Sequence, residues 1–292
     1  MKTYLDCIPC FFKQALETAR LAGADEKTQK KILMELSRVI SDFSLESCPP
    51  LMGRIIYGLI AESTGVNDPF KKIKQKSNAL ALSLYPGLKK KVESSDDRLL
   101  TAAELAIAGN IIDYGVKNSL EIEKEVEKFL NGDFDIHNDH KKPIFDYPDF
   151  KSALGRVEEV LYLADNSGEV VFDRVLIEEL GKKVIYAVKE KPIINDALIE
   201  DACACGIQQI AKVMSSGSDA PGTILDLCSK EFLDLYSRAE LIISKGQGNF
   251  EALNREKRPI FFLFKAKCPV LARDIGCKVG DTILKSTNNT GL

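Results

Sequence analysis

Five short apolar runs after residue 150 constrain the fold more than any other feature of the sequence. They lie at residues 160–164, 184–188, 207–213, 241–244 and 260–264. Each is rich in Val, Ile or aromatic residues and does not alternate with polar residues, which is typical of strands buried on both faces. Segments of helical character lie between them, for example 170–180 and 194–205. Repeated strand–helix units predict an α/β fold, with a mostly parallel, Rossmann-like sheet between helices.

The first part of the chain predicts helices and almost nothing else. Apolar residues recur there at spacings of three and four, as at Leu5, Ile8 and Phe12, and about six helices fit, with one break expected at Pro86. The 292 residues suffice for two domains. The predicted division is an all-helical domain at 1–131, a polar linker at 132–149, a Rossmann-like domain at 150–285 and a flexible tail at 286–292.

Composition excludes several classes of protein. Forty basic against 43 acidic residues give a net charge of −3, which disfavours nucleic acid as a partner. No apolar run approaches the ~18 residues of a membrane span, and the N-terminus lacks the apolar core of a signal peptide. We therefore expect a cytoplasmic protein with reduced thiols. With two histidines, His137 and His140, a three-histidine zinc site is excluded, so a metal would need carboxylate and amide ligands.

Polar residues follow the predicted strands, and the carboxyl ends of parallel strands meet at one edge of a sheet. Asp165, Asn166 and Asp196 would supply oxygen ligands for a divalent cation. A second set would bind phosphate through backbone N–H groups, amides or ammonium groups: Gly168, Lys245, Gly246, Gly248, Asn249, Lys265 and Lys267. Each stretch also has a purely structural interpretation, since Asp-Asn-Ser-Gly is common in turns and Asp196 could begin a helix.

Two further groups of residues leave alternatives open. Asn110 and Asp113 share one face of an apolar helix, where they would either face the site or bond a neighbouring helix. Cys7 and Cys10 form a CxxC, which together with Cys48 could bind a second metal, act as a redox pair or simply pack in the core.

These motifs, in order along the whole chain, resemble those of the DUF89, or ARMT1-like, damage-control phosphatases, in particular the prokaryotic branch with an N-terminal CxxC. The matching stretches are 7–10, 108–113, 165–169, 195–197, 218–222, 245–251 and 265–269. The resemblance implies a metal-dependent phosphatase of small phosphorylated metabolites, either sugar phosphates or damaged metabolites, that prefers Mn²⁺, Ni²⁺ or Co²⁺ and could use Mg²⁺. It implies Asp165, Asn166 and Asp196 as the metal ligands.

The reaction itself has two open forms. Either water attacks phosphorus, oriented by Glu169 or another carboxylate, or Asp165 is the nucleophile. The alternative functions are a nucleotide-dependent Rossmann-like enzyme and a metal- or metabolite-binding protein without catalysis. A carboxyl methyltransferase ranks last, because the turn after the first strand has one glycine, Gly168. Membrane partners are not expected, and the oligomeric state is not predicted.

Overall fold

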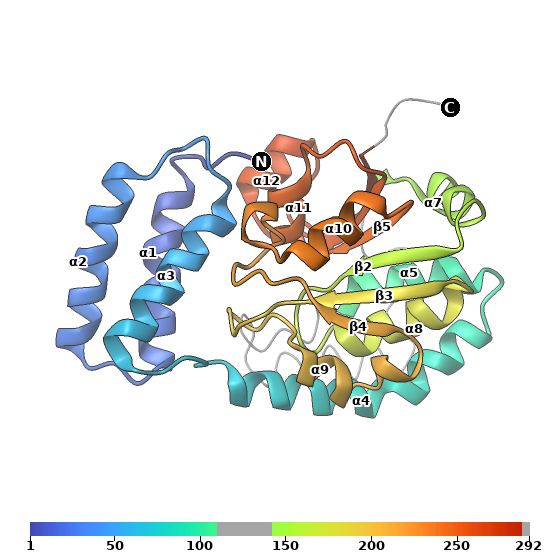
Figure 1. Ribbon diagram of the computed structural model, residues 1–292, viewed down its shortest axis with the longest axis horizontal. Coiled ribbons are helices and arrows are strands. Elements are labelled where there is room, and N and C mark those ends of the chain that lie inside the picture. The colour runs from blue at the N-terminus through green and yellow to red at the C-terminus, as the bar shows by residue number, and fades with distance from the viewer. Residues whose placement is uncertain (110–141, 288–292) are drawn as a thin grey trace.

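The computed structural model describes residues 1–109 and 142–287, and within them the centre is a seven-stranded sheet (Figure 1). The strands are β1 (Ile144–Phe145), β2 (Glu159–Leu163), β3 (Lys183–Val188), β4 (Lys212–Ser215), β5 (Ile242–Lys245), β6 (Ile260–Lys265) and β7 (Thr282–Ser286). Their order is β1-β7-β6-β5-β2-β3-β4. All neighbours pair in parallel except β6 and β7. The predicted α/β fold with a mostly parallel sheet is confirmed.

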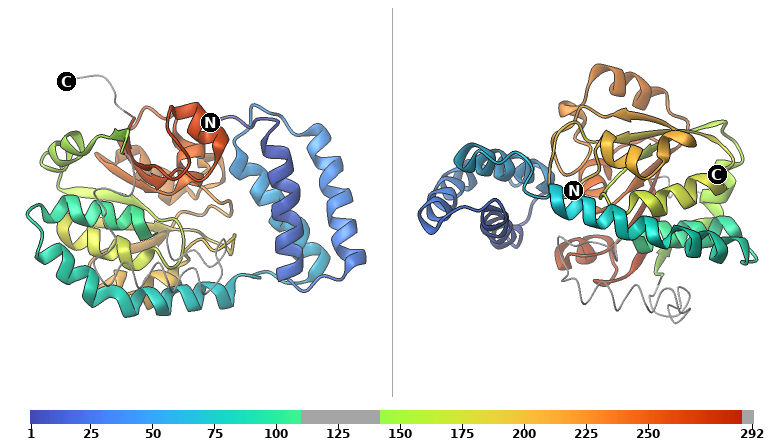
Figure 2. Two further views of the ribbon diagram at one scale, coloured as in Figure 1. Left: turned by 180° about the vertical axis from the view of Figure 1, so that it is seen from behind. Right: turned by 90° about the horizontal axis from the view of Figure 1, so that it is seen from below.

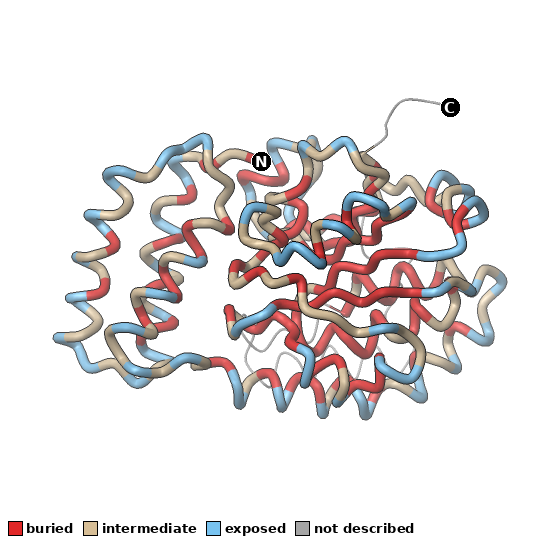
Figure 3. The backbone as a smooth tube through the Cα atoms, in the orientation of Figure 1, coloured by how far each residue is buried: buried red, intermediate tan, exposed pale blue. Residues whose placement is uncertain are grey.

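Both faces of the sheet are covered, because successive side chains of each strand enter different cores. Tyr162 and Tyr186 belong to one core, with α4 (Lys71–Glu93), α5 (Arg98–Ala108), α7 (Tyr147–Leu154), α8 (Val170–Leu180) and α9 (Ile199–Ala204). Leu161 and Ile185 belong to the other, with α10 (Lys230–Arg238), α11 (Gln247–Leu253) and α12 (Pro269–Ile275). Figure 3 shows the buried residues concentrated in the central strands. This two-sided burial explains the uninterrupted apolar runs.

Three helices stand to one side of this α/β part (Figure 2). They are α1 (Cys7–Leu21), α2 (Glu26–Asp42) and α3 (Pro49–Thr64), and they pack mainly on one another. Helix α3 also meets the loop after β4, where a Cβ on Gly53 would lie 2.6 Å from Pro221 Cγ. The helices α4 and α5 pack against α8 instead, so the predicted all-helical part contributes to both groups. The boundary at residue 131 stays a prediction.

No helix in the described ranges has the length and apolar character of a membrane span.

Several predicted elements were wrong in extent. The run 207–213 forms a 3-10 turn, η2 (Ile207–Gln209), before β4 begins at Lys212. Ile207 is fully buried, and burial alone does not distinguish a turn from a strand. The predicted helix 194–205 is reduced to α9, because its first part pairs with the loop after β2 through an Asn166–Asp196 bridge.

One predicted break was wrong, and two strands were missed. Pro86 lies inside α4 rather than at a break. Pro86 and Leu82, whose carbonyl loses its helical partner, are both exposed, so water can satisfy that carbonyl. The strand β1 and the start of α7 lie in the predicted linker, and β7, which lies between β1 and β6, pairs antiparallel with β6. A two-residue strand such as β1 carries too little pattern to be predicted.

Asp97 provides a test of how α5 and α7 are joined. It caps α5 by accepting a hydrogen bond from Leu100 N (3.1 Å), and it also accepts from Tyr147 Oη (2.7 Å) and Lys151 Nζ (2.8 Å). Lys151 is the main cause that lowers the pKa of Asp97 to about 2. Because this folded-state pKa lies below the unfolded value, the stabilisation is present above pH ~4 and is lost as the pH falls towards 2.

We expect Asp97→Asn to lower the unfolding free energy at neutral pH by about 1 kcal/mol. The difference from the unmodified protein should shrink between pH 4 and 2 in chemical denaturation. Asp25→Asn is the matched control, since Asp25 caps α2 through Thr28 N, and Asn is an equally good cap. Equal losses in both variants, or a difference independent of pH, would contradict this account.

Candidate functional site

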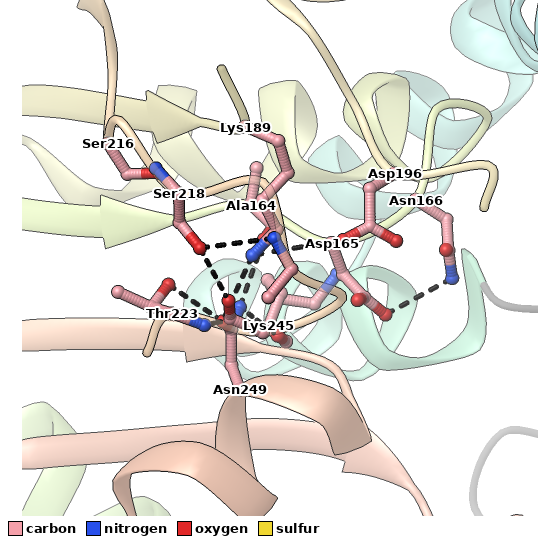
Figure 4. Close-up of polar contacts among 12 residues, drawn as sticks. Ala164, Asp165, Asn166, Lys189, Asp196, Ser216, Ser218, Thr223, Lys245 and Asn249 are labelled. Atoms are coloured by element: carbon pink, nitrogen blue, oxygen red, sulfur yellow. Dashed lines mark hydrogen bonds and ion pairs between the residues drawn. The ribbon is translucent and has the colours of Figure 1, made fainter. Parts of the chain in front are cut away.

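The loops that follow β2 and β3 are bonded to each other, and this brings the predicted ligands together. Asn166 and Asp196 form an isolated antiparallel bridge. Ala197 N donates to Asp165 O (2.8 Å), and Ser167 N donates to Asn195 O (2.9 Å). Ile194, which precedes this pairing, has φ of 45°, a strained conformation for a β-branched residue. Asp165, Asn166 and Asp196 therefore lie at one place, at the carboxyl ends of adjacent strands (Figure 4).

The side-chain amide of Asn166 has a fixed orientation. Its Nδ2 donates to Asp165 Oδ2 (3.1 Å) and to Glu169 Oε1 (2.9 Å). Because the nitrogen donates to two carboxylates, the oxygen is the atom of this amide that is left to bind another group. An amide presented through its oxygen suits a cation rather than an anion.

Negative charge is concentrated here. Burial, followed by the charges of Glu169 and Asp196, raises the pKa of Asp165 well above its usual range. Burial also raises the pKa of Asp196 to about 7, although the nearby Lys189 opposes the shift. Carboxylates crowded together in this way are stabilised by a bound cation.

The donor set fits a divalent ion. Asp196 Oδ2 is buried and has no hydrogen-bond partner among the described residues, and Lys189 Nζ lies 3.8 Å from it. No cluster of three His, Cys, Asp or Glu residues suited to a metal occurs in the part of the chain that the structure describes. A metal here would take two carboxylates and the amide oxygen of Asn166.

Gly246 is required by the close approach of Asp165. Gly246 has φ of 82°, and a Cβ on it would lie 2.0 Å from Asp165 Oδ2. Its N–H donates to Leu263 O (3.1 Å), so this group is already used within the sheet. Gly248 packs against Pro221, where a Cβ would lie 2.0 Å from the carbonyl oxygen. These contacts explain the glycines by packing, and Gly168 is buried in the loop after β2.

The predicted phosphate contacts of Lys245 and Asn249 are not supported by their hydrogen bonds. Lys245 is 1% exposed, and its Nζ donates to Asp173 Oδ1 (2.7 Å) and Glu169 Oε2 (3.1 Å). Asn249 Nδ2 donates to Ala164 O (3.0 Å) and Lys245 O (2.8 Å). Its Oδ1 accepts from Thr223 N (2.7 Å) and Thr223 Oγ1 (2.8 Å). Both side chains therefore connect the strands, helices and loops around the site to one another.

Three other lysines are placed differently. Lys267 is exposed and Lys265 is half-buried. The charge of Lys267 lowers the pKa values of both Asp165 and Asp196, which places it within electrostatic reach of the ligands. Lys189, which was not among the predicted site residues, is 4% exposed and lies beside Asp196 and Asn249 Oδ1 (3.4 Å). Its position directly after β3 was the signal that could have identified it.

Asp173 is a second residue that the sequence did not reveal. It is fully buried on α8 and accepts from Tyr162 Oη, Tyr186 Oη and Lys245 Nζ, each at 2.7 Å. A chain of bonds then runs from Asp173 through Lys245 and Glu169 to the amide of Asn166. The available signal was a carboxylate that directly follows three apolar residues at the start of α8.

The remaining predicted residues are not part of this cluster as described. Asn110 and Asp113 lie outside the described residues, as do His137 and His140. Cys7, Cys10 and Cys48 are free thiols. Burial raises the pKa of Cys7 and of Cys48, which disfavours the thiolate needed for redox or metal chemistry. Their role stays a prediction.

Fold and site together define a class: α/β proteins with a separate group of helices and an acidic, lysine-containing site at the strand ends. The chain belongs to the damage-control phosphatase ARMT1-like family, whose model matches residues 3–283. It is 35% identical over 282 residues to a damage-control phosphatase of Pyrococcus horikoshii, covering 94% of each chain. It is 33% identical over 285 residues to one of Archaeoglobus fulgidus, covering 96% of this chain and 97% of that one.

A solved structure shares the whole fold. The crystal structure of a DUF89 family protein from Pyrococcus horikoshii matches 99% of this chain and 100% of its own, with a TM-score of 0.85 and 32% identity.

The contribution of the buried Asp173 hydrogen bonds to the free energy of unfolding can be tested by substitution. Replacing Asp173 by Asn removes the charge that balances buried Lys245 and should lower the unfolding free energy by about 3 kcal/mol. Tyr162→Phe and Tyr186→Phe each remove one hydrogen bond and should lower it by about 1 kcal/mol. Urea denaturation of the three variants measures this. A loss in Asp173→Asn no greater than in the tyrosine variants would show that Lys245 does not depend on Asp173.

Proposed function

We propose that this protein is a metal-dependent phosphatase that hydrolyses phosphomonoesters of small metabolites. The observation that carries the proposal is the buried Asp196 Oδ2, which lacks a hydrogen-bond partner among the described residues, beside Asp165 and the Asn166 amide. Relatives named damage-control phosphatases support the reaction class. The substrates we propose are either sugar phosphates or damaged phosphometabolites.

Asp165, Asn166 and Asp196 would hold the metal through three oxygens. Such donors suit Mn²⁺ and Mg²⁺, and Ni²⁺ and Co²⁺ also accept them. When bound, the ion supplies a Lewis acid for a phosphoryl oxygen and lowers the pKa of a water molecule.

The chain's own groups have distinct tasks in this reaction. Lys189 would neutralise a phosphoryl oxygen as charge develops in the transition state, and Lys267 would add a second positive charge near Asp165. Glu169 accepts bonds from Asn166 on one oxygen and Lys245 on the other, so it positions Asn166 rather than orienting water. We favour attack by water, which keeps Asp165 as a ligand. Detection of a phosphorylated Asp165 by mass spectrometry during turnover would instead make it the nucleophile.

The test is phosphate release by metal-stripped protein with Mn²⁺, Mg²⁺, Ni²⁺ or Co²⁺ restored, on p-nitrophenyl phosphate and several sugar phosphates. Asp165→Ala should lose the activity and the rise in melting temperature caused by Mn²⁺. Lys189→Met should keep that rise but lose at least ~100-fold in kcat/KM, as expected for removal of a group that stabilises the transition state. Lys183→Met is the matched control, because Lys183 lies exposed at the opposite end of the same strand.

Each outcome has a defined meaning. No release with any ion would overturn the proposal. Binding of Mn²⁺ and phosphate without turnover would indicate a non-catalytic metal- and metabolite-binding protein. An equal loss in the Lys183 and Lys189 variants would remove the role given to Lys189.

A further inference from the structure

A cavity of about 610 Å³ lies between α3 and two of the loops at the strand ends. One wall is the second half of α3, including Tyr57, Gly58 and Ala61, together with the connection to α4. The opposite wall is made by Lys191, Pro192 and Ile193, with Asp219 at one side. The volume is typical of sites that enclose small organic ligands.

The loops that line the cavity also carry the candidate site. Lys191 to Ile193 belong to the loop between β3 and α9, which begins with Lys189 and contains Asp196. Asp219 belongs to the loop after β4, whose Thr223 bonds Asn249. Glu190 N donates to Ser218 O (3.0 Å), which ties the two loops together. The cavity and the candidate site therefore share their supporting backbone.

The lining of the cavity restricts what can fill it. Its walls are mainly apolar, with Ile55, Ile60, Val66 and Ile193 among them. A compact sugar carries hydroxyl groups on every side, and each loses hydrogen bonds to water against such walls. Arg54 and Lys191 face one carboxylate, Asp219, to which Arg54 Nε donates (2.5 Å). This excess of positive charge favours an anionic ligand.

We propose that this cavity binds the organic part of the substrate, and that the preferred substrates are phosphomonoesters with an extended, largely apolar arm. The proposal rests on the proposed function. The phosphate occupies the site at Asp165, Asp196 and Lys189, and the arm lies between α3 and Ile193. Each methylene buried there should improve kcat/KM by up to about fourfold.

Gly58 provides a clean way to fill the cavity. It lines the cavity on α3, and a Cβ added there meets no heavy atom within 4 Å. Its backbone is helical, so a larger side chain causes no backbone strain. Gly58→Leu should occupy the cavity, and Gly58→Ala should have a smaller effect. Glu62→Leu is the matched control, because Glu62 lies exposed on the same helix and does not line the cavity.

The experiment compares ethyl, butyl and hexyl phosphate as substrates with Mn²⁺ present. For the unmodified protein, kcat/KM should rise at least tenfold from ethyl to hexyl phosphate. Gly58→Leu should lower the hexyl-to-ethyl ratio at least tenfold, and Glu62→Leu should leave it unchanged. A flat series for the unmodified protein, or a ratio unaffected by Gly58→Leu, would overturn the proposal while leaving the phosphatase function intact.

Calorimetric binding of ethyl- and hexylphosphonate, which are not hydrolysed, tests the cavity without turnover. We expect tighter binding of the hexyl compound, at least tenfold, and loss of that difference in Gly58→Leu. If no phosphate ester is hydrolysed but the phosphonates show this difference, the cavity assignment stands and the proposed function fails. Equal binding of both phosphonates would overturn the cavity assignment itself.

Discussion

The arrangement of the site depends on an imbalance of charge at the ends of β2, β3 and β5. Four carboxylates lie there with two buried ammonium groups: Asp165, Glu169, Asp173 and Asp196, with Lys189 and Lys245. Lys245 is committed to Asp173 and Glu169, which leaves Asp165 and Asp196 with Lys189, 3.8 Å from Asp196 Oδ2, and with the exposed Lys267. The uncompensated charge lies where the loops after β2 and β3 bring Asp165, Asn166 and Asp196 together. Tyr162, Tyr186 and Lys245 all donate to Asp173, which is fully buried. Lys245 is therefore not available to pair with Asp165 or Asp196.

Much of the fold could be predicted from the sequence because burial on both faces leaves a strong pattern. The runs at 160–164, 184–188 and 260–264 each fall on a strand to within a residue. Prediction failed where a tertiary contact decided the local structure. The pairing of Asn166 with Asp196 prevents the helix expected from residue 194. The sequence of that segment alone does not indicate that it pairs with the preceding loop.

The site was predictable in position but not in orientation. The strand-end rule correctly gathered Asp165, Asn166 and Asp196, because it depends on topology alone. It also suggested Lys245 and Asn249 as phosphate contacts. Both side chains instead make hydrogen bonds to other groups of the protein. The direction in which each side chain points depends on its bonding partner, which is Asp173 for Lys245 and Thr223 for Asn249. Lys189 was missed although it directly follows β3, and Asp173 was missed because it lies in a helix, to which the strand-end rule does not apply.

Close contacts restrict substitution at the first half of α3, whereas the second half of the helix lines the cavity. Gly53 lies against Pro221, and a Cβ on Gly222 would lie 2.6 Å from Gly248 O, so α3, the loop after β4 and α11 are held in contact. Because α11 carries Asn249, which bonds Thr223 and Ala164, a change in these contacts would disturb the site. Gly58 and Ala61 lie further along α3 and face the cavity. Under the proposed function, substitutions there would alter the shape of the cavity and leave the carboxylates in place. The proposed chemistry and the proposed ligand selectivity would then depend on separate parts of the molecule.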